Sequence, residues 1–292
     1  MDHQIENKRL RVHIAPHGGA LTSVFDKENN HEWLYQKEDD SWQGQDIAIF
    51  PFIARLKNKK YTHHGQEYSL LNHGLCRYHD FVLEEQGEDY VELLFASDEE
   101  TLKQYPFPFR FHARYELQDN ALTITYRIEN TGEETMPFGL GAHPAFGLCA
   151  SVHDGVLDTS DNEVRLDQPT ALTRIVFDEK GEFVRGEEDY GVRESLPTDK
   201  ATFQAYQTLC VQGKGIDHVQ LVRGDGKRLD FTFDKINYLV LWSFLETGRF
   251  VAVEPWMSLP DFEDAPLEIM EKKTLLHLEP KQTYTFSYTL RV

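Results

Sequence analysis

Two titratable side chains of the sequence lie in surroundings that suit proton transfer. His143 lies within GLGAHPAFG, between glycines that allow close approach of backbone or ligand and Pro144, which should end a strand. Glu254 lies within VAVEPWMSLPD, after an apolar run and before Pro255, which should stop the pairing of the strand, and Trp256. A carboxylate beside an apolar wall has its pKa raised by desolvation, so it can act as a base near neutral pH. We interpret both as candidate catalytic residues, with a packed histidine and a solvent-facing strand-end glutamate as the alternatives.

Three further polar residues interrupt or end apolar segments. Arg55 lies in FPFIARLKNKKY, and His73 and Arg77 lie in LNHGLCRYHDF. They are candidates for ligand binding, or for ordering the walls of a pocket. Trp256 offers a flat apolar wall near Glu254, against which a ligand could pack.

A metal site at His73, Cys76 and His79 is the less favoured interpretation. Zn²⁺ does bind imidazole and thiolate. On an extended strand, however, residues three apart point to opposite faces, and no second ligand pair follows. The sequence has no phosphate-binding glycine loop, no dinucleotide fingerprint and no GxSxG elbow. These absences leave acid–base chemistry that needs no nucleophile.

The elements that must hold these residues are β-strands. Apolar residues alternate in the segments 111–117 and 122–128, with Gln118, Asp119 and Asn120 as a turn between them, which predicts a hairpin. Strands are also predicted at 10–16, 90–98 and 284–292, and the continuous apolar run 238–244 predicts a strand buried on both faces. The segment TLKQYPFPF is expected to open with a short turn. No long amphipathic helix is predicted. The fold class is all-β, a large sandwich.

A chain of 292 residues could form two average domains or one large all-β domain. We expect one domain over residues 1–292, because neither a linker nor a repeat is visible. Residues 151–215 are more charged and less periodic than the rest, which indicates long surface loops.

Composition excludes several classes of partner. The formal net charge of −19 argues against nucleic acid and against anionic membranes. No apolar run reaches the length of a membrane span, and the first twenty residues do not supply the apolar core of a secretory signal. The three cysteines are too few for a disulfide framework, which favours a cytoplasmic location.

Four ordered segments, PFIARLKNKKY, HGLCRYHDF, GAHPAFG and VAVEPWMSLPD, together resemble the aldose 1-epimerase, or galactose mutarotase, family, and most closely its LacX-like branch. The resemblance covers nearly the whole chain. It implies a large antiparallel β-supersandwich with a sugar cleft on one sheet face, and no required metal or cofactor. The expected partner is a small-molecule sugar, bound by a monomer or homodimer.

The resemblance also implies roles for individual residues. His143 falls at the position of the family's general acid and Glu254 at that of its general base. Arg55 and His73 fall at substrate-binding positions. Asp217 is a candidate for the aspartate with which classical members bind sugar hydroxyls.

Arg77 departs from the classical pattern, and a similar arginine occurs in relatives that act on hexose 6-phosphates. The first hypothesis is therefore a mutarotase for free aldohexoses. The second is a hexose-6-phosphate epimerase in which Arg55 and Arg77 clamp the phosphate. The third is a non-catalytic carbohydrate-binding protein. We expect Arg77 to pair with a neighbouring acid such as Asp80 or Glu84, which would suit neutral sugars.

Overall fold

The hairpin predicted from the alternating apolar residues lies in the larger of the sheets. The structure, a computed structural model, describes residues 2–38, 42–153, 156–244 and 248–292. Strands β10 (Phe109–Gln118) and β11 (Ala121–Asn130) pair antiparallel, with Phe111 opposite Ile128 and Tyr115 opposite Ile124. All four of these side chains are buried. The apolar residues that recur at every second position therefore lie on one face of this hairpin, and that face packs against the core.

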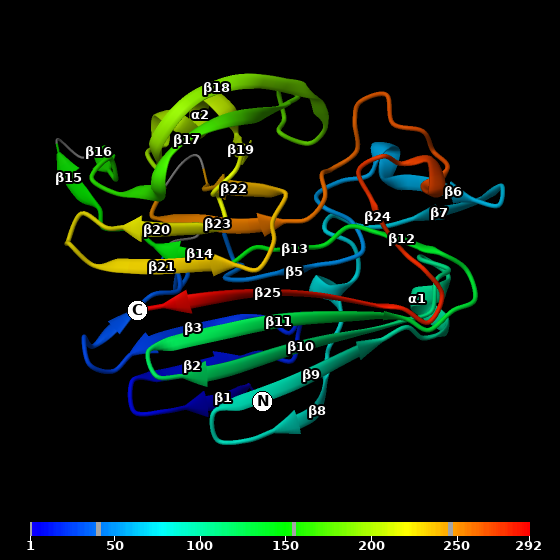
Figure 1. Cartoon of the computed structure of the whole chain (residues 1–292), viewed down its shortest axis with the longest axis horizontal. Coiled ribbons are helices and arrows are strands. Elements are labelled where there is room, and N and C mark those ends of the chain that lie inside the picture. The colour runs from blue at the N-terminus through cyan, green and yellow to red at the C-terminus, as the bar shows by residue number, and fades with distance from the viewer. Residues whose placement is uncertain (1, 39–41, 154–155, 245–247) are drawn as a thin grey trace.

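The 15-stranded sheet runs through the whole molecule (Figure 1). Its strands pair antiparallel, as the predicted sandwich class requires. Two strands branch from its main path: β14 (Ala145–Gly147) pairs with β23, and β18 (Val184–Pro197) pairs with β17. The path itself follows the order β5 (Ala48–Ile49), β13 (Gly141–Ala142), β23 (Phe250–Trp256), β22 (Tyr238–Trp242), β19 (Thr208–Gln212), β17 (Glu163–Phe177), β20 (His218–Val222), β21 (Arg228–Phe233), β25 (Thr283–Arg291), β11, β10, β9 (Tyr90–Ala96) and β8 (Val82–Gln86).

Smaller sheets complete the fold. A four-stranded sheet contacts β9 and β10 through its first strand, and it consists of β1 (His3–Glu6), β2 (Leu10–Ile14), β3 (Leu21–Asp26) and β4 (His31–Glu32). Three strand pairs are β6 (Lys60–His63) with β7 (Gln66–Ser69), β12 (Met136–Phe138) with β24 (Leu276–Leu278), and β15 (Ser151–His153) with β16 (Val156–Asp158).

Helix is confined to short turns, as expected from the absence of long amphipathic patterns. Helix α1 (Glu99–Leu102) is capped by the Asp98 side chain and contains the predicted turn. The others are α2 (Lys200–Tyr206) and the 3₁₀ turns η1 (Lys57–Lys59), η2 (Cys76–Tyr78) and η3 (Ile269–Glu271). Among the described residues, no helix is long and apolar enough to span a membrane.

The prediction of surface loops over residues 151–215 was wrong. This part of the chain holds the two longest strands, β17 and β18, which form a hairpin at the top of Figure 1. Strand β17 also pairs with β19 and β20, whereas β18 pairs with β17 and, among the described residues, makes one further isolated bridge from Val184 to Phe262. Half of the β18 residues are exposed and only two are buried, which explains why charge obscures the strand period in this segment.

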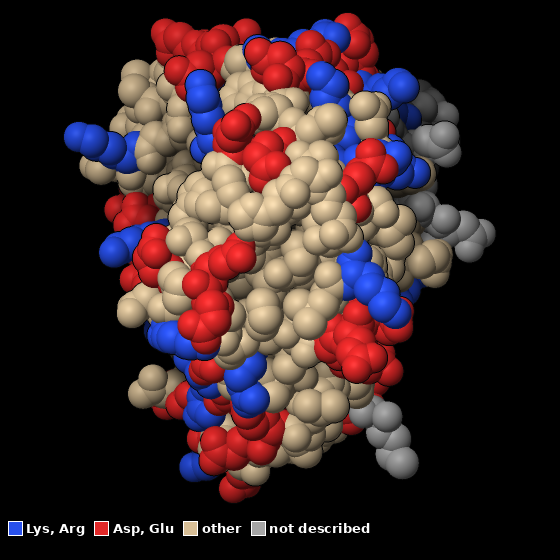
Figure 2. Space-filling model, turned by 90° about the vertical axis from the view of Figure 1, so that its right-hand side faces the viewer, with Lys and Arg blue, Asp and Glu red and all other residues tan. Residues whose placement is uncertain are grey.

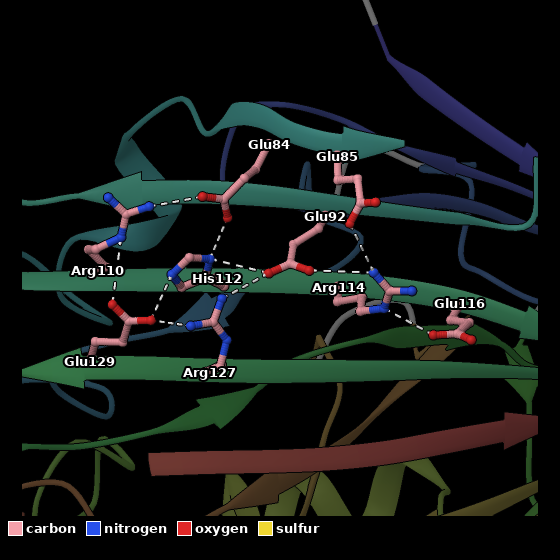
Figure 3. Close-up of polar contacts among 9 residues, drawn as sticks. All are labelled: Glu84, Glu85, Glu92, Arg110, His112, Arg114, Glu116, Arg127 and Glu129. Carbon is pink, nitrogen blue, oxygen red and sulfur yellow. Dashed lines mark hydrogen bonds and ion pairs between the residues drawn. The ribbon is translucent and has the colours of Figure 1, made fainter. Parts of the chain in front are cut away.

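The outer face of β8–β11 carries a network of ion pairs (Figure 3). Arg110, His112 and Arg114 alternate along β10 with the apolar residues that face the core. His112 is buried among acids, with its Nδ1 2.5 Å from Glu84 Oε2 and 3.2 Å from Glu92 Oε1. Arginines on β10 and β11 neutralise these carboxylates in turn, through Arg110–Glu84, Arg114–Glu92 and Arg127–Glu92.

Candidate active site

Sheet register brings His143 and Glu254 together. Strands β13 and β14 both pair with β23, through Gly141 opposite Trp256 and Ala145 opposite Ala252. Residues 143 and 254 lie midway between these two pairs, so the same register sets them opposite each other. The His143 Nε2 atom lies 3.3 Å from Glu254 Oε1.

The two prolines beside these residues act differently. Pro144 separates β13 from β14, as predicted. The prediction that pairing stops at Pro255 was wrong, because β23 continues through Trp256 and Pro255 lies opposite Leu239 of β22. Glu254 is consequently an interior position of a buried strand and not a strand end.

Burial determines the state of Glu254, whose side chain is 1% exposed. The Trp256 indole N–H donates to Glu254 Oε2 over 3.0 Å. Burial raises the pKa of Glu254 well above its ordinary value, the Trp256 hydrogen bond opposes this, and the nearby Asp46 carboxylate adds to it. Burial thus shifts the balance of Glu254 toward the protonated carboxyl.

His143 is enclosed by other rings. Its centroid lies 5.2 Å from that of Trp42, 5.4 Å from that of Trp242 and 5.7 Å from that of His73. Burial, together with a smaller effect of the positive charge of Arg77, lowers the pKa of His143 to about 3. The ring is therefore neutral at pH 7, in contrast to an ordinary imidazole with a pKa of 6.5.

His73 is fixed by a reciprocal contact with Ala54. The His73 amide donates to the Ala54 carbonyl over 2.8 Å, and the Ala54 amide donates to His73 Nδ1 over 3.3 Å. Both residues have positive φ, 62° and 46°. Because Nδ1 accepts, the proton of the neutral ring lies on Nε2. Burial, together with the charges of His143, Arg77 and Arg55, keeps the pKa of His73 well below its ordinary value.

Gly74 allows this backbone to approach strand β5. Its φ is 76°, and a Cβ atom there would lie 2.4 Å from the Phe50 carbonyl oxygen. That oxygen accepts the amides of Leu75 and Cys76. Glycine is therefore required at this position both by its conformation and by the lack of space.

All six predicted site residues line one cavity of 390 Å³. This volume lies within the range of roughly 300–1,000 Å³ that small-molecule sites occupy. The six are Arg55, His73, Arg77, His143, Glu254 and Trp256. Asp217 does not belong to this cavity; its side chain is exposed.

The expected pairing of Arg77 was wrong. Asp80 pairs with His17 and Glu84 pairs with Arg110 and His112, so both acids are already engaged. No ion pair of Arg77 occurs within the described part of the chain, and its guanidinium lies 5.1 Å from the centre of the Tyr78 ring. Arg77 also lines a neighbouring cavity of 470 Å³.

Arg55, by contrast, is neutralised. Its Nη1 lies 2.6 Å from Oε1 of Glu182, a residue of the turn between β17 and β18. Lys180 and Gly181 of the same turn also line the cavity.

Several residues of the site were missed by sequence reasoning. Trp42 and Trp242 form the aromatic wall around His143, and Lys180 and Glu182 form part of the rim. Trp242 lies in the apolar run predicted as a buried strand, so its size was an available signal. Nothing in the local pattern marks the other three as site residues.

The His73, Cys76 and His79 set does not converge. His73 lines the cavity, Cys76 is buried, and His79 Nδ1 lies 2.8 Å from the Leu75 carbonyl oxygen. These residues are not among the described groups whose ligand atoms gather closely enough to hold a metal ion.

Relatives of known sequence resemble the chain over nearly its full length or over about half of it. Protein LacX, in its plasmid form from Lactococcus lactis subsp. lactis, is 27% identical over 99% of this chain and 98% of the relative. An uncharacterized protein, YphB, from Escherichia coli strain K12 is 22% identical over 48% of this chain and 49% of the relative.

Solved structures show the same fold. The galactose mutarotase related enzyme from Lactobacillus acidophilus has a TM-score of 0.92 at 27% identity, over 100% of this chain and 97% of that one. A galactose mutarotase-like protein from Lactobacillus casei ATCC 334 has a TM-score of 0.90 at 24% identity, over 100% and 99%.

Fold and cavity together define a protein of the galactose mutarotase-like β-sandwich class. The family model described as aldose 1-epimerase matches residues 1–218, and the chain belongs to this family. Family and structural neighbours support a carbohydrate epimerase.

Proposed function

We propose that the protein is an aldose 1-epimerase that interconverts the α and β anomers of a free aldohexose by acid–base ring opening. The observation that carries this proposal is the contact of His143 Nε2 with Glu254 Oε1, at 3.3 Å, within a cavity of ligand size. Both groups are candidates for proton transfer, and both line the same space.

The reaction needs two proton transfers at neighbouring atoms. A base removes the proton of the C1 hydroxyl while an acid protonates the ring oxygen, which opens the ring to the aldehyde. Rotation about the C1–C2 bond and reclosure on the other carbonyl face give the other anomer. The C1 hydroxyl oxygen and the ring oxygen are both bonded to C1, so an acid and a base that lie side by side can reach both.

In this proposal Glu254 removes the C1 hydroxyl proton and His143 protonates the ring oxygen. Their pKa shifts favour a pair that holds one proton, as carboxylic acid with neutral imidazole. Transfer of that proton from Glu254 to His143 produces the carboxylate and imidazolium that the first step uses. The two groups exchange roles on reclosure, so one shared proton is enough for both directions.

The surrounding residues hold the sugar. The Nε2–H of His73 is a neutral donor for an oxygen that gains negative charge in the transition state. Trp256 orients the Glu254 carboxyl through its indole N–H, and the aromatic walls offer apolar surface for the C–H face of the ring.

A hexose 6-phosphate is the second candidate substrate, and the free state of Arg77 favours it. An unpaired guanidinium at a cavity wall can bind a phosphate bidentately, and the neighbouring cavity that Arg77 also lines gives additional space. The clamp of two arginines is weakened, however, because Arg55 is held by Glu182. We therefore place the free aldohexose first.

A non-catalytic carbohydrate-binding role is less well supported. Sugar binding alone needs hydrogen-bond donors and stacking surfaces, and it does not need two buried groups able to exchange a proton.

Polarimetry on freshly dissolved α-anomers tests the proposal. The panel comprises free aldohexoses and their 6-phosphates, each with and without the protein. Acceleration of mutarotation for a free aldohexose supports the proposal. Binding of sugars without acceleration of any of them would overturn it in favour of a binding protein.

A further inference from the structure

A tight turn places two histidines on one side of the hairpin β6–β7. His64 and Gly65 join the two strands with φ values of 51° and 78°. Adjacent residues of a regular strand point to opposite faces. Here the turn brings the His63 and His64 ring centroids within 4.1 Å of each other.

Both imidazoles meet the same carboxylate oxygen. Glu134 lies in the connection between β11 and β12, and its Oε2 is 3.2 Å from His63 Nε2 and 3.1 Å from His64 Nε2. The three ligand atoms all lie within 4.8 Å of one another.

We propose that His63, His64 and Glu134 bind a divalent transition-metal ion, with Zn²⁺ as the best match. Two imidazole nitrogens and one carboxylate oxygen form a donor set that zinc prefers. With metal–ligand bonds of about 2.0–2.1 Å, the ligand atoms of a tetrahedral site lie about 3.3 Å apart. The two nitrogen–oxygen separations observed are close to this value.

The second nitrogen of His63 strengthens the inference. His63 is buried, and its Nδ1 faces Glu268 Oε1 at 3.7 Å, so the ring lies between two carboxylates. A neutral imidazole has one N–H and can donate to only one of them. When Nε2 of His63 binds a metal ion, the ring proton lies on Nδ1 and can be donated to Glu268. Metal-binding histidines commonly donate their other ring N–H to a carboxylate in this way.

Glu268 is itself held in place. Its Oε2 accepts a hydrogen bond from the Thr62 hydroxyl over 3.0 Å, and Thr62 pairs with residue 268 in an isolated bridge. The carboxylate behind His63 is therefore part of the structure of the hairpin and is not a freely moving side chain.

The site is open on one side. His64 and Glu134 have side chains 73% and 59% exposed, so an ion can enter and water can occupy the fourth position. Figure 2 shows the end of the molecule that carries β6–β7 in Figure 1, where acidic and basic groups both border uncharged surface. The net charge of −19 of the whole chain favours the approach of cations.

A second group of possible ligands, Glu84, Glu92 and His112, is less suitable. Arg110, Arg114 and Arg127 already pair with these carboxylates, as Figure 3 shows. Their positive charges oppose the binding of a cation. By comparison, no arginine or lysine pairs with Glu134 or Glu268 in the described part of the chain.

Equilibrium dialysis of the EDTA-treated full-length protein against ZnCl₂, followed by metal analysis, tests this proposal. We expect one ion per chain. His64→Asn removes the imidazole while keeping a residue that tolerates positive φ, and we expect it and Glu134→Gln to weaken zinc binding at least tenfold. Glu268→Gln should weaken it by about 10–100-fold through loss of the outer hydrogen bond.

His17→Ala is the matched control, because His17 and Asp80 form an exposed imidazole–carboxylate pair with only one histidine. This variant should bind zinc like the wild type. Zinc should also raise the melting temperature of the wild type and of His17→Ala, but not that of His64→Asn. Failure of the wild type to bind zinc, or binding that His64→Asn leaves unchanged, would overturn the proposal and leave a hydrogen-bonded cluster.

Discussion

His143 and Glu254 occupy opposed positions in the register that β13 and β14 share with β23, and their side chains meet at 3.3 Å. Pro144 interrupts the strand only between these two pairing segments. Gly141 allows the close packing, since a Cβ there would lie 2.8 Å from the Trp256 ring. The geometry of the proposed acid–base pair is thus determined by the sheet and not by flexible loops.

Glu254→Gln should abolish most turnover and leave the fold intact. The glutamine has nearly the same shape and its amide oxygen can still accept the Trp256 N–H, but it cannot carry the proton. We expect kcat to fall by about 10²–10⁴-fold, the range that general acid–base catalysis contributes. Polarimetry gives kcat, and a sugar-induced thermal shift reports binding.

Glu182→Gln is the control, because Glu182 lies in the same cavity but pairs with Arg55. It should change kcat far less than Glu254→Gln. Near wild-type turnover of Glu254→Gln would show that Glu254 is not the base.

The pH dependence of kcat/KM should show no acid limb near 6.5. His143 is already neutral at pH 7, because burial lowers its pKa to about 3, while Glu254 keeps a proton above its ordinary range. The pair gains a second proton only as the pH falls toward 3, so kcat/KM should not decrease as the pH is lowered from 7 to 5. Activity recovered after return to neutral pH separates titration from unfolding. An inflection near pH 6.5 that His143→Gln removes would contradict this assignment.

Substrate charge should be decided by Arg77. We expect a free aldohexose to have a higher kcat/KM than its 6-phosphate in the wild type. Arg77→Ala should lower any activity on the 6-phosphate by about 10–100-fold, the value of a hydrogen bond to a charged group, with a smaller effect on the free sugar. A preference of the wild type for the 6-phosphate that Arg77→Ala abolishes would favour the second candidate substrate.

Gly74→Ala should destabilise the protein and disturb His73. Its φ of 76° and the 2.4 Å approach to the Phe50 oxygen leave no room for a methyl group, and we expect a loss of about 2 kcal/mol or more in the free energy of unfolding. Gly226→Ala is the control, with φ of 82° and open space around it, and should cost about 1 kcal/mol. Urea unfolding measures both variants. Equal losses in the two would refute the close approach as the cause.

Local patterns predicted much of the fold and of the site. The hairpin β10–β11 follows from a two-residue period that each strand contains within itself. The six predicted site residues do lie in one cavity. They could be predicted together because the family resemblance contains information about long-range contacts, which residue spacing alone lacks. Arg77 shows the limit. Asp80 and Glu84 are near in sequence, but tertiary structure gives them His17 and Arg110 as partners.

The rim of the cavity could not be predicted for a similar reason. Lys180 and Glu182 lie in a charged turn whose position depends on the pairing of β17 with β19 and β20. That pairing joins residues far apart in the chain, and the surrounding charges hide the strand period.

The turn between β17 and β18 supplies part of the cavity rim, whereas the proposed catalytic pair lies elsewhere in the chain. The proposed proton carriers are fixed inside the sheet, whereas Lys180, Gly181 and Glu182 reach the cavity from the tip of a hairpin whose second strand pairs with no further strand in the described part of the chain. Changes in that tip can alter which sugars enter without disturbing the buried pair. Divergence of substrate range within this fold, and its redesign in the laboratory, can therefore proceed through an exposed hairpin tip while the chemistry stays the same.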